Sequence, residues 1–239
     1  MQKNIIYEDN DIIIAYKPAG IATQTARLGQ QDMVSELKNY LAGKAENKGK
    51  GVPYLGLVHR LDQPVAGILA FAKNKEAAAS LSRQLTDGGF HKYYEALVFG
   101  RPEKEQAALE DYLYKDAKTN KSMVVKEGFP GAKKAKLSYT RKETLMVWEA
   151  RQEASLLEIE LFTGRHHQIR VQMANAGIPL LGDSKYGSDA DKQFSQQIGC
   201  RNVALCACRL RFQHPKTGKE MCFERQPEEE IFLPFLNSF

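Results

Sequence analysis

Residues 57–73 read LVHRLDQPVAGILAFAK and place an arginine and an aspartate inside an otherwise apolar run. The segments LGLV before this pair and GILAFA after it are typical of buried strands, so Arg60 and Asp62 fall at a junction between two pieces of core. A charge in such a place is costly unless it is paired or takes part in chemistry. The pattern therefore predicts a functional role for the pair.

The composition of the chain limits its class. It has 239 residues, 43% of them hydrophobic, which is enough for a core. No apolar stretch approaches the ~20 residues needed to cross a bilayer, and the first residues lack the apolar block of a secretory signal. We expect a folded cytoplasmic protein that needs no membrane. The formal net charge of +5 permits a polyanionic partner.

The four cysteines all fall in the last fifth of the chain. Cys206 and Cys208 are two residues apart in an alternating run, which places both on one face of a strand. Zinc sites favour a Cys-x-x-Cys spacing, which this run does not have. We predict buried free thiols at Cys200, Cys206, Cys208 and Cys222, and no metal.

Apolar periodicity indicates more strands than helices. A hairpin is expected over residues 4–18, helices over 31–41, 75–85 and 166–177, a polar surface loop over 45–51, and strands over 92–100, 136–145, 148–162 and 202–214. Many strands with few helices between them predict an α+β fold with a largely antiparallel sheet. Because no segment has the composition of a linker, residues 1–239 are expected to form a single domain.

Three groups of polar residues could carry chemistry: residues 59–62 in a loop between strands, residues 92–94 at the start of a strand, and residues 163–172 in the first turns of a helix. Each has an ordinary structural explanation as a turn former, a core residue or a solvated face. Capping does not explain Asp62, because Gln63-Pro64 follows it and the next helix begins a dozen residues later. An amphipathic helix does not explain the adjacent histidines at 166 and 167 either, because neighbouring side chains of a helix point about 100° apart.

The run HRLDQPVAGILAFAK resembles the signature of the RluA-type RNA pseudouridine synthases, in which a His-Arg-Leu-Asp run carries the catalytic aspartate. Other blocks resemble further family motifs in the family's order, over roughly residues 5 to 220: IIYEDNDIIIAYKPAG, KYYEALVFG, TGRHHQIRVQMANAGIPLLGDSKYG and LRFQHPKTGKE. An ordered set of motifs is far more specific than any one of them.

This resemblance implies the pseudouridine synthase fold, a largely antiparallel mixed sheet with helices and loops flanking a central RNA-binding cleft. The implied reaction detaches the base of a flipped-out uridine from ribose C1′, rotates it and rejoins it through carbon 5. It needs no metal or cofactor. The implied partner is ribosomal or transfer RNA, and we expect a monomer without an obligate protein partner or the N-terminal RNA-binding module of larger relatives.

Site roles follow from matching positions in the motifs. Asp62 matches the catalytic carboxylate, Arg170 the basic residue that pairs with it, and Arg60 the arginine that holds the RNA with its base flipped out. Tyr94, rather than Tyr93, matches the active-site tyrosine. A permanent guanidinium charge suits a carboxylate that must stay ionised, and a tyrosine ring can stack on an extruded base. The same blocks supply five further RNA-binding candidates: His59, Lys92, Arg165, His167 and Gln168.

The sequence departs from the family pattern at two places. Val65-Ala66 replaces a frequent Thr-Ser, which removes two hydroxyls beside the catalytic carboxylate, and Cys206 replaces a frequent histidine. Two basic stretches, 44–50 and 133–136, are interpreted as solvated loops rather than as dedicated RNA contacts.

Two other functions compete with this interpretation. An RNA-cleaving hydrolase would use His59 with His166 or His167 as acid and base, and would leave Asp62 with only an orienting role. A catalytically silent RNA-binding protein of the same fold would bind RNA without forming product. A metal hydrolase has the least support, because few carboxylates lie near the histidines.

Overall fold

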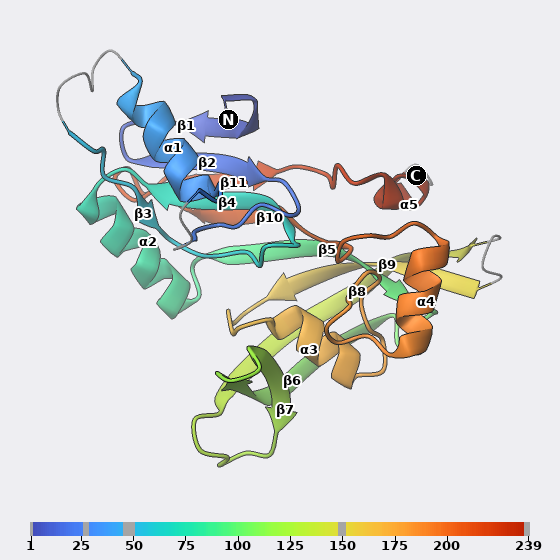
Figure 1. Ribbon diagram of the computed structural model, residues 1–239. Helices are drawn as coiled ribbons and strands as arrows, with labels where there is room; N and C mark the ends of the chain where they lie inside the picture. The colour runs from blue at the N-terminus through green and yellow to red at the C-terminus, as the bar shows by residue number, and fades with distance from the viewer. Residues whose placement is uncertain (1, 26–28, 45–50, 148–151, 237–239) are drawn as a thin grey trace. The chain divides into compact units, whose positions relative to one another are not determined.

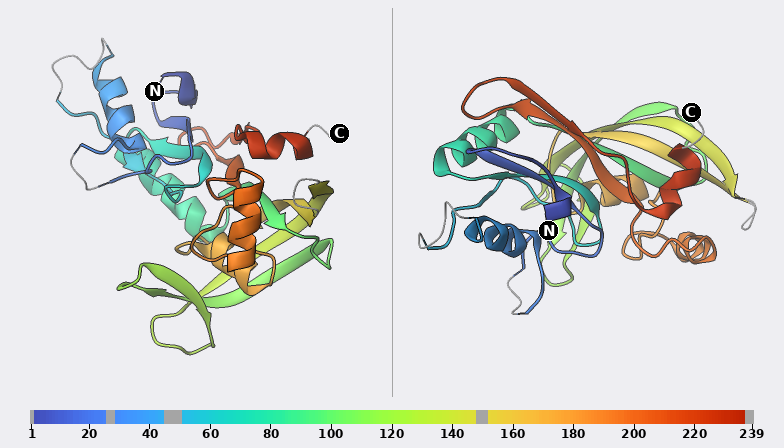
Figure 2. Two further views of the ribbon diagram at one scale, coloured as in Figure 1. Left: turned by 45° about the vertical axis from the view of Figure 1, so that its right-hand side comes forward. Right: turned by 90° about the horizontal axis from the view of Figure 1, so that it is seen from above.

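A computed structural model describes residues 2–25, 29–44, 51–147 and 152–236 (Figure 1). The chain divides into two compact units. Unit 1 consists of Met1–His91 and Ala207–Gln226, and unit 2 of Lys92–Cys206 and Pro227–Phe239. The helices of unit 1 are blue to blue-green in Figures 1 and 2, and the two longer helices of unit 2 are orange.

Unit 1 is built on a sheet in which the strand order is β1, β2, β4 and β10. The strands of the unit are β1 (Ile5–Glu8), β2 (Ile12–Lys17), β3 (Gly56–Leu57), β4 (Ala66–Ala72), β10 (Leu205–Gln213) and β11 (Glu220–Glu224). The expected hairpin is confirmed, because β1 and β2 pair antiparallel. Every residue of β2 and β4 is buried, which is why both read as continuous apolar runs.

The helices of unit 1 begin with the caps that their sequences favour. In α1 (Met33–Ala42) the side chain of Asp32 accepts a hydrogen bond from Ser35 N at 2.8 Å. In α2 (Lys75–Asp87) the side chain of Asn74 accepts from Ala77 N, and Gly88 ends the helix in a left-handed conformation at φ 82°. Both predicted helices are confirmed, with a short 3₁₀ turn, η1 (Gln2–Asn4), before the first strand.

Unit 2 is built on antiparallel strands in the order β5, β9, β8, β6, β7. Its elements are β5 (His91–Phe99), β6 (Gln106–Asp116), β7 (Lys121–Val125), β8 (Lys133–Val147), β9 (Gln152–Leu161), α3 (Gln168–Asn175), α4 (Asp189–Gln197), η3 (Glu230–Phe232) and α5 (Leu233–Leu236). Helix α3 packs against β6 and β7. A hydrophobic core cluster contains Leu97, Leu156, Phe194 and Phe232. The segment with η3 and α5 therefore packs into the core of unit 2.

Several expectations require correction. Lys133–Lys136 is not a loop, because β8 begins at Lys133. The third helix begins at Gln168 rather than at residue 166, although Gly177, at φ 77°, does follow its end. Most of the predicted surface loop over 45–51, and the start of the strand predicted over 148–162, lie outside the described residues. Among the described helices, none is long and apolar enough to cross a bilayer.

The thiols are free but not all buried. Cys200, Cys206 and Cys208 are buried as predicted, whereas Cys222 is exposed, so the prediction is wrong for that residue. It lies on the short strand β11, where alternate residues face solvent. Burial raises the pKa of the Cys200 thiol to about 11, which keeps it protonated and unreactive at neutral pH.

Candidate functional site

Asp62 lies in a tight turn between β3 and β4 of unit 1. Its carbonyl accepts a hydrogen bond from Val65 N at 3.0 Å, and its side chain is partly buried. Arg60 is exposed. Strand β4 follows at once, and Gly67 within it, at φ 128°, lies so close to the chain that a Cβ there would stand 2.4 Å from Ala207 N. The strand that follows the turn therefore needs glycine at position 67, where its backbone packs directly on that of Ala207.

Thr23 forms hydrogen bonds with the backbone of Leu61, the residue before Asp62. Its hydroxyl donates to the carbonyl of Leu61 at 2.8 Å and accepts from the amide of Leu61 at 3.2 Å. Thr23 is 2% exposed, so these bonds form away from water. One side chain thus satisfies both backbone groups of Leu61 and fixes the chain on the N-terminal side of Asp62.

The residue after Asp62 is held from the same segment. The carbonyl of Gln63 accepts from Gly20 N at 2.9 Å and from Lys17 Nζ at 3.1 Å, and its side-chain amide donates to the carbonyl of Gly20 at 3.0 Å. Lys17 is completely buried and also donates to the carbonyls of Pro18 and Ile21. The Lys-Pro-x-Gly turn therefore holds the backbone after Asp62, and Thr23 holds the backbone before it.

The side chain of His59 contacts the protein core rather than standing free in solvent. Its Nε2 accepts the amide of Ala70 at 3.2 Å, and its ring lies 5.4 Å from that of Phe90, which stacks on Phe212. An imidazole that accepts a strand amide helps to fix the turn. Its predicted contact with RNA stays a prediction.

Strand β5 brings Lys92 and Tyr94 to one face in unit 2. Lys92 is 6% exposed and Tyr94 is 4% exposed, whereas Tyr93 between them is only partly buried. Because successive side chains of a strand point to opposite faces, Lys92 and Tyr94 belong together and Tyr93 does not. Burial alone therefore distinguishes the two tyrosines.

The two histidines precede α3 rather than lying in it. His167 has a left-handed φ of 54°, which is uncommon for a residue with a side chain. This conformation lets the rings of His166 and His167 stack at 3.7 Å. His166 Nδ1 lies 2.9 Å from Ser122 Oγ, and His167 Nδ1 lies 2.7 Å from the hydroxyl of Tyr186. The pair thus joins the start of α3 to β7 and to the segment before α4.

Gln168 organises the turn before it. Its side-chain oxygen accepts from Thr163 Oγ1 at 2.7 Å and from Arg165 N at 3.0 Å, and its amide donates to the carbonyl of Lys136. Gln168 is 3% exposed. Its predicted RNA contact stays a prediction, but these bonds already give it the role of bracing the loop that carries Arg165.

Arg170 forms a bidentate ion pair that the sequence did not reveal. Its Nε and Nη2 each donate to one oxygen of Asp183 at 2.7 Å, and both side chains are almost fully buried. One carboxylate oxygen also accepts the amides of Lys185 and Tyr186. Asp183 therefore fixes the plane of the guanidinium. The predicted pairing of Arg170 with Asp62 joins residues of different units and stays a prediction.

Lys92 is a buried cation with no ion-pair partner in the part of the chain that the structure describes. Burial, together with the nearby charge of Arg165, lowers the pKa of Lys92 to about 8. Among the described residues, its amine has no hydrogen-bond or ion-pair partner. Arg165 is exposed and donates its Nε to the carbonyl of Lys134 at 3.0 Å.

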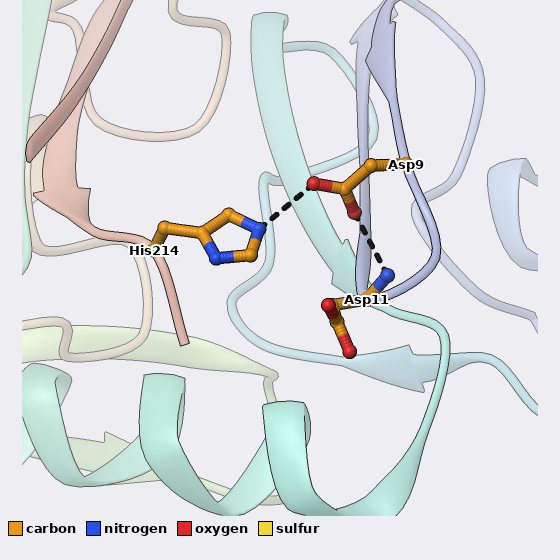
Figure 3. A group of neighbouring side chains, drawn as sticks. All are labelled: Asp9, Asp11 and His214. Atoms are coloured by element: carbon orange, nitrogen blue, oxygen red, sulfur yellow. Dashed lines mark hydrogen bonds and ion pairs between the residues drawn. The ribbon is translucent and has the colours of Figure 1, made fainter. Parts of the chain in front are cut away.

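One cluster in unit 1 has the composition of a metal site. Asp9, Asp11 and His214 offer ligand atoms that lie within 4.8 Å of one another (Figure 3). His214 Nε2 donates to Asp9 at 2.8 Å, and the other oxygen of Asp9 accepts the amides of Asp11 and Ile12. Because these atoms already bond one another, we interpret the cluster as a hydrogen-bonded tie between the β1–β2 turn and the end of β10.

The tie predicts acid sensitivity. Burial opposes ionisation of Asp9, but hydrogen bonds from the Ile12 and Asp11 amides, Tyr7 and His214 outweigh it, and the pKa of Asp9 falls below its usual value. A carboxyl whose folded pKa is depressed stabilises the protein above its unfolded pKa, and this contribution is lost as pH falls through the folded pKa.

Asp9→Asn is expected to lower the free energy of unfolding by about 1–3 kcal/mol at pH 7, because an amide N–H would face the His214 N–H. Urea titrations of both proteins should show this difference shrinking below about pH 4. A difference that is constant from pH 7 to pH 3 would contradict the role of ionised Asp9.

Comparison with known proteins places this geometry in context. A family model described as RNA pseudouridylate synthase matches residues 11–175. The chain is 33% identical over 235 residues to "Ribosomal large subunit pseudouridine synthase D" of Zymomonas mobilis, covering 97% of this chain and 71% of that protein. It is 34% identical over 224 residues to "Ribosomal large subunit pseudouridine synthase C" of Pasteurella multocida, covering 92% and 63%.

Two solved human structures share the fold. "Human RNA Pseudouridylate Synthase Domain Containing 1" superposes with a TM-score of 0.72 at 22% identity, covering 98% of this chain and 86% of that one. "Human RNA Pseudouridylate Synthase Domain Containing 4" gives a TM-score of 0.72 at 20% identity, covering 97% and 91%. The expected α+β fold with a mostly antiparallel sheet is thereby confirmed.

Proposed function

Because this chain belongs to the RNA pseudouridylate synthase family and is thus an isomerase that acts on RNA, we propose that Asp62 is the carboxylate that carries the reaction. The supporting observation is the brace around it. The residues on both sides of Asp62 are held by hydrogen bonds from Lys17, Gly20 and Thr23. A nucleophile needs such fixed placement, because small displacements of a reacting group are costly in rate.

The proposed chemistry is an isomerisation that conserves all atoms of the nucleotide. Asp62 attacks the nucleotide as the bond between uracil N1 and ribose C1′ breaks, and the base rotates. A bond then forms between C5 and C1′, the carboxylate is released, and the proton on C5 is lost while N1 gains one. The ionised state of the carboxylate is essential to the attack.

Three other residues support this chemistry in the proposal. Tyr94 stacks on the extruded base and takes part in proton movement at the sugar. Arg170 keeps the carboxylate ionised, and Asp183 holds the plane of Arg170. Exposed Arg60 contacts the RNA whose target base is flipped out. His59, Lys92, Arg165, His167 and Gln168 either contact RNA or position residues that do.

We further propose that the substrate is a uridine of large-subunit ribosomal RNA, since two similar proteins are named for that activity. The matched residues 11–175 include parts of both units, which favours one catalytic domain over residues 1–239. We propose that it works as a cytoplasmic monomer, without a cofactor, an obligate protein partner or a membrane.

Tritium release from RNA labelled at uridine carbon 5 tests this function. Transcripts of large-subunit ribosomal RNA and of a pool of transfer RNAs would be compared at equal uridine concentration. Release from the ribosomal transcript alone would support the proposed substrate. Release from transfer RNA alone would overturn the substrate and keep the reaction. Binding without release from either RNA would support the catalytically silent alternative.

Thr23→Val is predicted to lower kcat about 10- to 100-fold with little change in RNA affinity, because the Leu61 amide and carbonyl lose their partner and the backbone before Asp62 is freed. Valine preserves the shape but removes the hydroxyl. Thr23→Ser retains the hydroxyl and should restore most of the turnover. Single-turnover tritium release with both variants measures this. Equal loss of turnover in the two variants would show that packing, not the hydrogen bonds, is responsible.

A further inference from the structure

Two cations of unit 2, Lys92 and Arg165, lie close enough to interact, and no described residue places an anion between them. Among the described residues, Lys92 Nζ has no hydrogen-bond or ion-pair partner although Lys92 is 6% exposed. Arg165 is close enough to depress the pKa of Lys92, and its one side-chain hydrogen bond to a described residue goes from Nε to the Lys134 carbonyl. A buried ammonium beside a second cation is unfavourable, so its retention needs an explanation.

The surroundings leave the amine approachable. Gly164 is exposed and has no side chain, and a Cβ there would stand 3.6 Å from Lys92 Nζ, with no other described atom within 4 Å outside the two neighbouring residues of the chain. The loop is also rigid, because Gln168 holds Thr163 and the amide of Arg165. A fixed pair of cations next to an uncovered backbone position suits an incoming anion that carries several acceptor oxygens.

We propose that Lys92 and Arg165 form a binding site for a backbone phosphate of the substrate RNA, next to the nucleotide that Tyr94 receives. This inference rests on the proposed function of Tyr94. Lys92 and Tyr94 lie on the same face of β5, two residues and therefore about 7 Å apart, so one nucleotide can reach both. The ammonium supplies a compact charge, and the guanidinium of Arg165 supplies the forked donors that phosphate favours.

The charge state of Lys92 agrees with this role. With a pKa of about 8, the amine is mostly protonated at pH 7 and mostly neutral at pH 9. A bound phosphate favours the protonated form, so RNA binding should weaken as pH rises through this range. Lys92→Met removes the titrating group and should make binding independent of pH between 7 and 9, apart from changes shared with the control below.

The test measures binding of a twelve-residue oligouridylate at 50–200 mM salt, with Lys92→Met and Lys104→Met each placed in an Asp62→Asn background. Lys104 is exposed between Glu103 and Glu105 and serves as the control. Loss of one phosphate contact should reduce the slope of log K against log salt by about 0.7 in Lys92→Met only. An unchanged slope would overturn the proposal.

Thermal melting separates this site from a structural role. Removing an uncompensated buried charge should leave the melting temperature of Lys92→Met unchanged or higher. A lower melting temperature together with weaker RNA binding would overturn the proposal, since Lys92 would then support the fold. These measurements need no turnover. Failure of the Asp62 assignment would appear instead as tritium release by Asp62→Asn.

Discussion

Asp62→Asn is expected to abolish pseudouridine formation, with a loss of about 10⁴-fold or more in kcat, while folding and RNA binding are largely retained. Asparagine has nearly the same shape as aspartate but no negative charge, so it cannot act as the nucleophile. The hydrogen bonds that fix this turn are made by the flanking backbone of Leu61 and Gln63, and the substitution leaves them in place.

Tritium release, an oligouridylate binding curve and a thermal melt should be recorded on the same preparation. Asp189→Asn is a suitable control, because it makes the same chemical change on a side chain that is fully exposed at the start of α4. Turnover by Asp62→Asn above a trace would show that another residue is the nucleophile. Loss of turnover with an equal loss in the Asp189 control would point to a general effect of the preparation.

The turn at Asp62 could be predicted from sequence because its signal is local. The apolar run after the charged pair forms β4, which is buried along its whole length, so the pair beside it stands out. The run before the pair, residues 55–58, is a strand only at Gly56–Leu57 and is mostly partly buried, so the expectation of a buried strand there is wrong. Strands β6 and β7 were missed because their residues are mostly exposed or partly buried. Their polar composition resembles a loop, and only pairing with β8 makes them strands.

Helix α4 was missed although a local signal was present. Its sequence DADKQFSQQ is polar, but Ser188 and Asp191 form a reciprocal capping box, which is recognisable as a serine followed three residues later by an acidic residue. The left-handed backbone of His167 had no such signal. A residue with a side chain adopts this conformation only when the surrounding contacts impose it.

Asp183 shows why part of the site was not predicted. The segment GDSKYG ends one of the quoted family motifs, and Asp183 within it accepts the amides of Lys185 and Tyr186 as a turn aspartate does. Its second function, holding Arg170 thirteen residues earlier, depends on how the first turn of α3 packs against this segment. The spacing of residues in the sequence carries no information about this packing contact.

Arg170→Met is expected to lower the free energy of unfolding by about 3–5 kcal/mol and to abolish turnover, because it leaves the buried Asp183 carboxylate without its bidentate partner. Adding Asp183→Asn removes the stranded charge while an amide oxygen can still accept the Lys185 and Tyr186 amides. The double variant should therefore be more stable than Arg170→Met alone. Urea unfolding of the wild type, both single variants and the double variant measures the coupling.

Turnover separates the structural from the catalytic part of this pair. If Arg170 only stabilised the fold, the double variant would regain activity along with stability. We expect stability to recover in part and activity not at all, because the proposed catalytic group is the guanidinium itself. Arg170→Lys adds a second comparison, since it keeps a positive charge but loses the planar fork that reaches both oxygens of Asp183. Full activity in Arg170→Lys would mean that the positive charge alone is sufficient for catalysis. A melting temperature of Arg170→Met equal to that of the wild type would mean that the ion pair contributes nothing to stability.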